Sequence, residues 1–387
     1  MPLDAFGEES VERMLNAQRI IYRRPPDPEL APARGKAPNT PEAIHLGMER
    51  KSRYRGRQGP DTSQRFRRAS QILFLLLNVW IGWEFYFFVR YYETQGQTAF
   101  VARPAGVEGW LPIAALMNLK YFLLTGLIPK IHAATLFLLV AFLAISWLWT
   151  KSFCSWLCPI GTLSEALWKL GRRVFKGNLR LPRWVDIPLR SLKYLLLAFF
   201  LYAVGTMSAA AIAAFLESPY GLVADVKMLN FFRFLSGTAP LVISLLVLLS
   251  VAIQNFWCRY LCPYGALMGL AALSGPAKIT RQPQRCIDCS RCAKACPSWL
   301  PVDKREAVLS AECTSCLECV AACPAAGALQ MSVGRQTIVP AWAIGLGIAV
   351  VFLGVVGYAK IAGYWDTELP ESIYFRLIPQ AQDLGHP

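Results

Sequence analysis

The sequence predicts an α-helical polytopic membrane protein with about five transmembrane helices and a small cysteine-rich module inserted before the last of them. Two observations predict this class. The chain has 387 residues, of which 55% are hydrophobic and 17% are charged, a composition too apolar for an ordinary soluble protein. The apolar residues also gather in runs of about 20, the length that a helix needs to cross a bilayer. The net charge of +15 does not indicate nucleic-acid binding, because the basic residues cluster beside the apolar runs.

The N-terminal segment, residues 1–69, is polar and rich in proline and arginine, and we expect it to be largely disordered and cytoplasmic. Its second half carries a run of basic residues: Lys51, Arg53, Arg55, Arg57, Arg65, Arg67 and Arg68. Because basic residues tend to stay on the cytoplasmic side of a membrane, we interpret this run as a topology signal for the first span.

Five apolar runs are predicted to span the membrane. They are residues 71–92, 133–152, 191–214, 239–257 and 338–361. A sixth run, residues 109–128, contains Lys120 and ends at Pro129. We interpret this run as an interfacial or re-entrant helix, with a transmembrane helix as the alternative.

Charges in the connecting segments predict the orientation. The loop 159–193 is basic, whereas the tail after residue 361 is mainly acidic. The positive-inside rule places the N-terminal segment and this loop in the cytoplasm, and five spans then place the C-terminus on the outer side. The last span and the outer tail make up residues 336–387.

Eight cysteines form two strings with identical spacing, C-x2-C-x2-C-x3-C-P. The strings are Cys286, Cys289, Cys292 and Cys296, and Cys313, Cys316, Cys319 and Cys323. This is the spacing of bacterial ferredoxins with two 4Fe–4S clusters, in which the fourth cysteine of each string ligates the other cluster. The sequence therefore predicts a cytoplasmic double-cluster ferredoxin module over residues 278–335. Zinc and disulfides are the alternatives, but zinc does not explain the interleaved pattern.

The ligand sets follow from this interleaving. Cluster one takes Cys286, Cys289, Cys292 and Cys323. Cluster two takes Cys313, Cys316, Cys319 and Cys296.

The other four cysteines belong to an internal repeat. Residues 153–161 read FCSWLCPIG and residues 257–265 read WCRYLCPYG. The membrane domain, residues 70–277, is thus predicted to consist of two parallel repeats that each end in C-x3-C-P. Residues spaced by four share one face of a helix, so we expect the two pairs to meet in one joint site. The members of this site are Cys154, Cys158, Cys258 and Cys262.

Three interpretations of this joint site remain open: redox-active thiols, an additional metal or cluster site, and cysteines that serve only packing. Packing is the weakest, because the reactivity of cysteine usually decides where it is used. We expect the basic loop 159–193 and Arg259 to favour thiolates here by lowering the pKa of the cysteines.

Other polar residues are candidates for a role within the membrane. Glu84 lies inside the first span, where an acid is a functional hypothesis by default, and it is a candidate for proton handling with a quinol. The alternative is that Glu84 reaches the outer headgroups among aromatic residues. Lys120, Asp225 and Arg233 are candidates for a second polar site on the outer side.

The histidine content bears on haem. The chain has only three histidines, at positions 45, 132 and 386, whereas two transmembrane haems need about four axial ligands. The sequence therefore predicts no haem b.

These motifs together resemble a known family. The stretch from Arg103 to Ile113, the two C-x3-C-P repeats and the double ferredoxin string resemble the polyferredoxin membrane proteins of anaerobic respiration. That family includes the membrane quinol-dehydrogenase subunit of the periplasmic nitrate reductase system and the iron–sulfur flavoprotein of nitrous oxide respiration. The resemblance covers roughly residues 70–335. The nitrous-oxide members carry an outer flavin-binding domain where this chain has its polar segment, so covalent flavin is not expected.

The resemblance implies a membrane-bound iron–sulfur electron-transfer protein of the bacterial cell inner membrane. Such proteins take electrons from quinol or from a cytoplasmic donor and pass them towards a periplasmic acceptor or a further iron–sulfur subunit. A bound quinone is therefore a candidate cofactor. Two alternatives stay open: a copper-reducing assembly protein for a respiratory enzyme, and a redox-sensing regulator.

Overall fold

The structure, a computed structural model, describes residues 56–57, 59, 61–334, 337–367 and 369–385. Most of the predicted N-terminal segment, with His45, lies outside the described residues, as does His386. The described part of that segment is ordered against the rest of the chain. Gly56 pairs with Ala325, and the first long helix already begins at Ser63, ahead of the predicted position 71.

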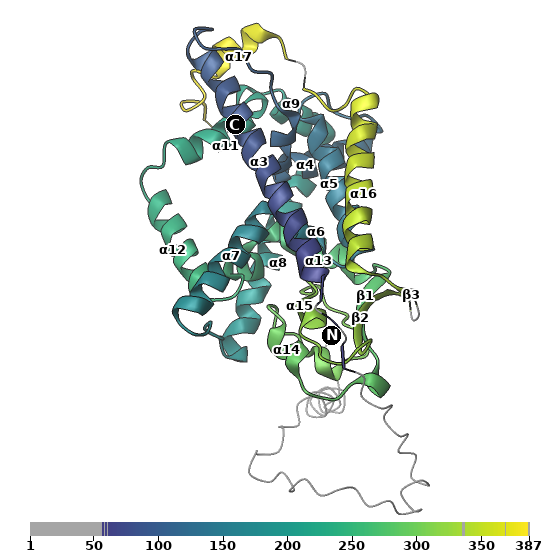
Figure 1. Ribbon diagram of the computed structural model, residues 1–387. Helices are drawn as coiled ribbons and strands as arrows, with labels where there is room; N and C mark the ends of the chain where they lie inside the picture. Colours follow the sequence, from purple (N-terminus) through teal and green to yellow (C-terminus); the bar gives the residue numbers. More distant parts are fainter. Residues whose placement is uncertain (1–55, 58, 60, 335–336, 368, 386–387) are drawn as a thin grey trace, which may run out of the picture. The chain divides into compact units, whose positions relative to one another are not determined.

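Three helices are long and apolar enough to cross a membrane: α3 (Ser63–Glu93), α8 (Arg183–Thr206) and α16 (Ala341–Ile361). They correspond to the predicted first, third and last spans, and α3 and α16 are easily traced in Figure 1. The chain is therefore a mainly helical protein with candidate membrane spans. Helix α8 begins directly after Pro182, whose backbone is extended, and it starts and ends earlier than the predicted run 191–214.

The other two predicted spans are interrupted. Helix α5 (Ala133–Leu148) has 16 residues and α12 (Ala239–Ala252) has 14 residues, so neither meets the length of a full span. The chain turns after each, with a positive φ of 54° at Lys151 and 53° at Asn255. These two residues occupy the same position in the two sequence repeats. The predicted number of about five spans is therefore not confirmed.

A short helical turn carrying the first cysteine of each pair follows each interruption, and then a longer helix. The first half has α6 (Phe153–Trp156) and α7 (Pro159–Val174), and the second half has η3 (Trp257–Leu261), a π-helix, and α13 (Pro263–Leu273). Proline at the first position of α7 and α13 lacks the N–H that a helix start leaves unpaired.

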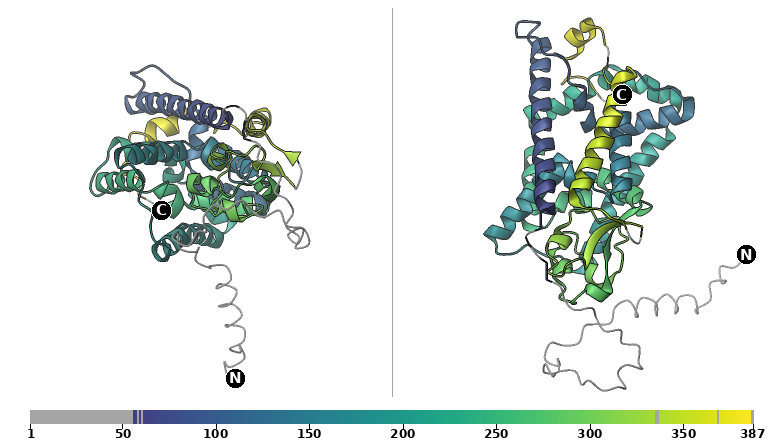
Figure 2. Two further views of the ribbon diagram at one scale, coloured as in Figure 1. Left: turned by 60° about the horizontal axis from the view of Figure 1, so that its bottom comes forward. Right: turned by 45° about the vertical axis from the view of Figure 1, so that its right-hand side comes forward.

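The sixth apolar run forms η2 (Ala105–Trp110) and α4 (Pro112–Thr125). Four short helices later in the chain lie at the same end of the molecule, opposite to the ferredoxin module in Figures 1 and 2. They are α9 (Ala209–Leu216), α10 (Pro219–Leu222), α11 (Ala224–Arg233) and α17 (Glu371–Leu377).

The ferredoxin module contains one antiparallel sheet in the order β1-β2-β3. The strands are β1 (Ala277–Arg281), β2 (Leu329–Val333) and β3 (Thr337–Ile338). The helical segments between β1 and β2 are η4 (Pro283–Arg285), α14 (Arg291–Ala295), η5 (Val302–Lys304) and α15 (Glu318–Ala321). Ile279 and Met331 of the sheet share one hydrophobic core with Ile145, Trp156 and Met268 of the helical domain, so the module packs directly on the helices.

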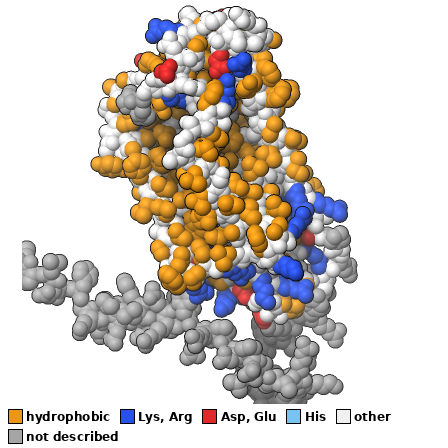
Figure 3. All heavy atoms as spheres, turned by 90° about the vertical axis from the view of Figure 1, so that its left-hand side faces the viewer, with side chains coloured by type: hydrophobic (Ala, Val, Ile, Leu, Met, Phe, Trp, Pro, Cys, Tyr) orange, Lys and Arg blue, Asp and Glu red, His pale blue; other side chains and the backbone are white. Residues whose placement is uncertain are grey.

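Hydrophobic side chains dominate the surface between the two ends of the molecule, as one face in Figure 3 shows, while lysine and arginine side chains gather at the ferredoxin end. Exposed examples are Leu73 and Val79 on α3 and Leu353 on α16. A large continuous apolar surface is expected for helices that face lipid.

Candidate iron–sulfur centres and the cavity between them

The eight ferredoxin cysteines lie in two groups that mix the two strings. A small cavity is lined by four of them: Cys296, Cys313, Cys316 and Cys319. Burial raises the pKa of Cys323, and the neighbouring Cys289 and Cys286 of the other string raise it further. The fourth cysteine of each string therefore lies beside the cysteines of the other string, the arrangement that two 4Fe–4S clusters require.

The cysteines of these groups suit a metal cofactor. Burial raises the pKa of Cys313 to about 11 and that of Cys316 to about 12, because a thiolate away from water is unstable alone. A coordinating metal reverses this balance and binds the deprotonated thiol. All twelve cysteines of the chain are free thiols in the structure, so the disulfide alternative finds no pair.

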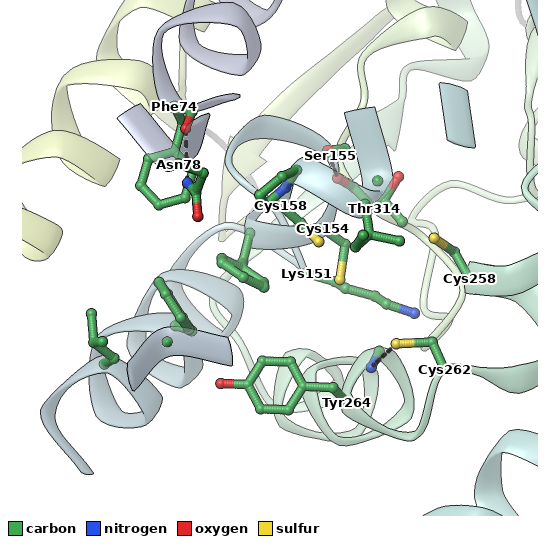
Figure 4. A pocket seen from close by; sticks show the side chains of 18 of the residues that line it. Phe74, Asn78, Lys151, Cys154, Ser155, Cys158, Cys258, Cys262, Tyr264 and Thr314 are labelled. Carbon is green, nitrogen blue, oxygen red and sulfur yellow. Dashed lines mark hydrogen bonds between the residues drawn. The ribbon is translucent and has the colours of Figure 1, made fainter. Parts of the chain in front are cut away.

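The four C-x3-C-P cysteines line a second, larger cavity of about 610 Å³. Cys154 and Cys158 reach it from α6 and the start of α7, and Cys258 and Cys262 from η3 and the start of α13 (Figure 4). The second cysteine of each pair is the residue that caps the N-terminus of the following helix. The two pairs thus face one space, as the sequence repeat predicted.

The expected lowering of the pKa of these thiols is wrong. Burial raises the pKa of Cys154 to about 11 and that of Cys258 to about 12, and nearby Lys151 offsets only part of this effect. Arg259 does not face the sulfurs as a free cation. Its guanidinium is paired with Asp186 at 3.0 Å and lies over the ring of Trp299 at 4.1 Å.

The larger cavity connects the ferredoxin side of the molecule with the opposite end. Near the ferredoxin module its lining includes Cys316, Glu312 and Glu318, and at the far end it includes Trp110 and Asn78. The Trp110 indole donates a hydrogen bond to the Asn78 side-chain oxygen at 3.1 Å. Between these ends the walls are mainly apolar, with Leu77, Leu138, Phe142, Phe352 and Val356 among the lining residues.

Hydrogen bonds hold the C-x3-C-P segment of the first half against the loop of cluster two. Ser155 donates to the carbonyl oxygen of Thr314, and the Trp156 indole donates to that of Ser315 at 3.1 Å. Gln64 of α3 donates to the carbonyl oxygen of Cys316 at 2.9 Å. The acceptors of the first two bonds, Thr314 and Ser315, lie between Cys313 and Cys316. The same hydrogen bonds therefore position the C-x3-C-P cysteines of the first half and the cysteines of cluster two.

Buried ion pairs reinforce this contact. Arg67 has no exposed surface and pairs with Glu165 of α7 at 2.6 Å and with Glu318 of α15 at 3.2 Å. Lys193 of α8 pairs with Glu312 at 2.6 Å. Arg67 was predicted only as part of a basic topology signal, and its structural role depends on partners that are distant in the sequence.

The sequence analysis missed a buried cluster of charges at the end of the molecule opposite to the module. Arg103 lies 3.0 Å from Glu108 and 2.7 Å from Asp225, and His132 lies 3.3 Å from Glu108. Burial raises the pKa of Glu108, but Arg103 and His132 together lower it to about 2. Arg103 and Glu108 belong to the stretch that carried the family resemblance, which was the available signal.

The predicted outer site of Lys120, Asp225 and Arg233 does not form. Lys120 donates to the carbonyl oxygen of Gly205 at 2.6 Å and so stabilises the end of α8. Asp225 pairs with Arg103 as described above, and Arg233 pairs with Glu93 at 2.8 Å. Each of these three side chains therefore has its own partner, and the three do not share a site.

Glu84 lies on α3, partly exposed, and its side chain makes no hydrogen bond or ion pair within the part of the chain that the structure describes. It is not among the residues that line the larger cavity. The structure therefore does not bring Glu84 together with the cysteines.

Family profiles match the same segments. The profile of a 4Fe–4S binding domain matches residues 131–178 and again residues 235–281, and each of these segments contains one C-x3-C pair. The profile of a 4Fe–4S dicluster domain matches residues 278–324, which hold both ferredoxin strings. The chain thus contains 4Fe–4S-binding domains, as its spacing predicted.

Three relatives extend the comparison. The chain is 52% identical over 328 residues to YccM, a candidate electron transport protein of Escherichia coli strain K12, covering 83% of this chain and 92% of YccM. It is 32% identical over 169 residues to the regulatory protein NosR of Pseudomonas aeruginosa, covering 42% of this chain and 22% of NosR. It is 26% identical over 149 residues to the ferredoxin-type protein NapH of Escherichia coli strain K12, covering 38% of this chain and 47% of NapH.

No solved structure matches the chain. The match to YccM extends over most of both proteins, and the resemblance inferred from the motifs is confirmed. The chain belongs to the family of polyferredoxin-type respiratory proteins that includes YccM, NosR and NapH.

Proposed function

We propose that the chain is a membrane-bound iron–sulfur protein that accepts electrons from quinol and relays them towards a periplasmic respiratory acceptor, as a quinol-dehydrogenase subunit. The observation that carries the proposal is the cavity of about 610 Å³ with mainly apolar walls, which reaches Cys316 at the ferredoxin end. Apolar cavities with a few well-placed polar groups are the usual binding sites of such small molecules. A quinol headgroup in this cavity would lie beside cysteine-held centres.

The 4Fe–4S clusters supply single-electron transfer when bound, at potentials that depend on burial and on hydrogen bonds to the sulfurs. The chain's own residues provide the rest. Asn78 and Trp110 offer polar groups at one end of the cavity, and Lys151 offers a cation at the other. The apolar walls between them exclude water and favour a lipid-soluble donor.

We also propose that the two halves arose by duplication. Helix α3 packs on α6 and α7, and α8 packs on η3 and α13 in the same way. Across the halves, α5 packs on α13 while α12 packs on α7. This exchange of partners, and the matching turns at Lys151 and Asn255, support two parallel repeats.

The proposed location is the bacterial cell inner membrane, with several spans, the ferredoxin module in the cytoplasm and the C-terminus in the periplasm. The basic side chains at the ferredoxin end support this orientation (Figure 3). The proposed partners are the membrane, a periplasmic acceptor and, as an alternative, a further iron–sulfur subunit. Because NosR is described as a regulatory protein, a regulatory role is a second candidate function.

A substitution that fills the cavity tests the quinol proposal. Leu77 of α3 is 41% exposed and lines the cavity, whereas Leu73 on the same helix is 72% exposed and does not line it. We expect Leu77→Trp to slow the reduction of the clusters by a quinol analogue in nanodiscs, while reduction by dithionite stays normal. Leu73→Trp is the matched control and should behave as the unmodified protein. Equal rates in the two variants would contradict a quinol in this cavity.

A further inference from the structure

We propose that Cys154, Cys158, Cys258 and Cys262 together bind one further 4Fe–4S cluster, held between the two halves of the membrane domain. The proposal rests on the electron-transfer function above and adds a third centre to it. Among the three interpretations of these cysteines, it selects the cluster over reactive thiols and over packing.

The first argument is convergence. The two pairs come from segments about one hundred residues apart, yet all four side chains line one cavity (Figure 4). Each pair is placed there by the same device, an interrupted helix with a left-handed residue, Lys151 in one half and Asn255 in the other. A backbone conformation that costs energy at both positions is expected where the geometry serves a site.

The second argument concerns the hydrogen-bond donors around the sulfurs. Cys158 and Cys262 cap the N-termini of α7 and α13, helices of 16 and 11 residues. The N–H of Gly265 donates to the Cys262 sulfur at 3.2 Å. Two helix N-termini thus direct positive ends of peptide dipoles at the same cavity, which favours a negatively charged occupant. Backbone N–H donors to sulfur are also what iron–sulfur ligands receive in proteins.

Glycine at position 161 permits close packing in the first motif. A side chain at Gly161 would place its Cβ 2.2 Å from the carbonyl oxygen of Cys154, which no residue tolerates. At Gly265 an added Cβ would lie 3.5 Å from the Cys262 sulfur, which is an ordinary van der Waals contact. Gly161 therefore brings the start of α7 directly against the cysteine turn of the first half.

The third argument is a buried cation. Lys151 is 3% exposed, lines the cavity and runs between the two cysteine pairs (Figure 4). Its ammonium donates to the carbonyl oxygen of Ala311 at 3.2 Å and lowers the pKa of Glu312, a carboxylate that Lys193 already pairs with at 2.6 Å. A buried ammonium needs a negative partner. Four cysteine thiolates around an iron–sulfur core carry a net negative charge, so this cluster adds negative charge beside Lys151, which otherwise shares Glu312 with Lys193.

The fourth argument is position. Ser155 and Trp156, which lie between Cys154 and Cys158, hydrogen-bond to Thr314 and Ser315, between two cysteines of the cluster-two string. The cavity also reaches Cys316 itself. A third centre at this place would lie directly between the ferredoxin module and the membrane interior, where an electron relay is needed.

The chemistry of the donor set fits the group. Four thiolates are the usual ligands of a 4Fe–4S cluster, and the profile of a 4Fe–4S binding domain matches both segments that supply them, residues 131–178 and 235–281. Because each segment contains only one pair, a complete ligand set exists only when both halves contribute.

Iron and acid-labile sulfide analysis of the anaerobically purified protein tests the proposal. We expect about twelve iron atoms per chain, against about eight from the ferredoxin strings alone. The double variant Cys154→Ser/Cys258→Ser should lose about one third of the iron and sulfide and keep the electron paramagnetic resonance signals of the two ferredoxin clusters. Cys289→Ser is the matched control and should instead lose the signal of cluster one.

Any of the following results would overturn the proposal. About eight iron atoms in the unmodified protein would leave no third cluster, and this measurement stands even where the double variant fails to fold. Iron content unchanged by the double substitution would place the extra iron elsewhere. One zinc per chain, or a disulfide between these cysteines found by mass spectrometry, would assign the site to the competing chemistries. The iron count does not depend on quinol, so the proposed function can fail while this site stands.

Discussion

At the scale of single residues, the cysteines illustrate what spacing can and cannot predict. Identical spacing in two copies predicted that Cys154 and Cys158 would face Cys258 and Cys262, and the four do line one cavity. The same pattern predicted a lowered pKa, which burial reverses. Desolvation depends on how neighbouring segments cover a side chain, and a linear pattern of charges does not contain that information.

Lys151 yields a prediction at this scale. Its ammonium lies beside the proposed third centre, and a nearby positive charge stabilises the reduced, more negative form of a cluster. Lys151→Met should therefore lower the reduction potential of that centre, with a smaller effect on cluster two, because the charge of Lys151 also reaches Cys313. A redox titration followed by electron paramagnetic resonance measures this shift. Lys294→Met, which removes an exposed lysine of the module, is the control, and equal potentials in both variants would refute the role of Lys151.

His132 predicts a pH dependence. Its Nδ1 lies 3.3 Å from Glu108, and its Nε2 lies 2.9 Å from the carbonyl oxygen of Gly221, so both nitrogens face acceptors. Burial lowers its pKa, but Glu108 and Asp225 outweigh burial and the opposing charge of Arg103, and the pKa is raised above 6.5. The resulting stabilisation is complete below pH 6.5 and is lost as pH rises through the raised value.

Thermal unfolding across this pH range tests the role of His132. The unmodified protein should lose apparent thermal stability as pH rises above neutrality, and His132→Gln should have a flatter pH profile because it cannot carry the charge. An unaltered profile in His132→Gln would show that another group titrates.

At the scale of elements, the interrupted helices explain why the predicted spans were too long. The apolar runs 133–152 and 239–257 continue through residues that end α5 at Leu148 and α12 at Ala252. Hydrophobicity reports the preference of a segment for lipid, but it carries no information on a left-handed turn within the run. The start of α3 was predicted too late for a related reason. Arg67 is charged, yet it is buried by partners from α7 and α15.

Arg67 is expected to hold the ferredoxin module on the helices. Arg67→Ala removes this partner from Glu165 and Glu318, which are half-buried. Both carboxylates keep their ion pairs with Lys169, so the cost stays below the value of about 3–5 kcal/mol for breaking a fully buried pair. We expect a lower temperature of unfolding and faster loss of iron on dilution. Arg65→Ala removes an exposed neighbour on the same helix and should have little effect. Equal stability of the two variants would show that Arg67 is not needed for this contact.

At the scale of the whole molecule, the sequence predicted the helical class, the ferredoxin module and the family, because periodic hydrophobicity and cysteine spacing are local signals. The charge cluster around Arg103 and Glu108 was missed because its members come from three segments that only the fold brings together. The role of Lys120 was misjudged for the converse reason. A lone polar residue in an apolar run stands out in a sequence, although Lys120 serves only to stabilise the end of α8.

Orientation in the membrane is the next prediction at this scale. A reporter fused at residue 300, in the ferredoxin module, should report cytoplasm, and one fused at residue 380, beyond α17, should report periplasm. The basic side chains at the ferredoxin end provide the reason. If both fusions report the same compartment, an even number of spans separates them, and the proposed orientation of the tail is wrong.

Quinol-driven reduction of the clusters in nanodiscs tests the central claim most directly. We expect a quinol analogue to reduce the ferredoxin clusters of the unmodified protein, and to do so much more slowly in Cys154→Ser/Cys258→Ser, while dithionite reduces both proteins equally. Glu84→Gln should match the unmodified protein, because Glu84 does not line the cavity. If quinol leaves the clusters oxidised in the unmodified protein although dithionite reduces them, the claim of quinol-linked electron transfer is contradicted.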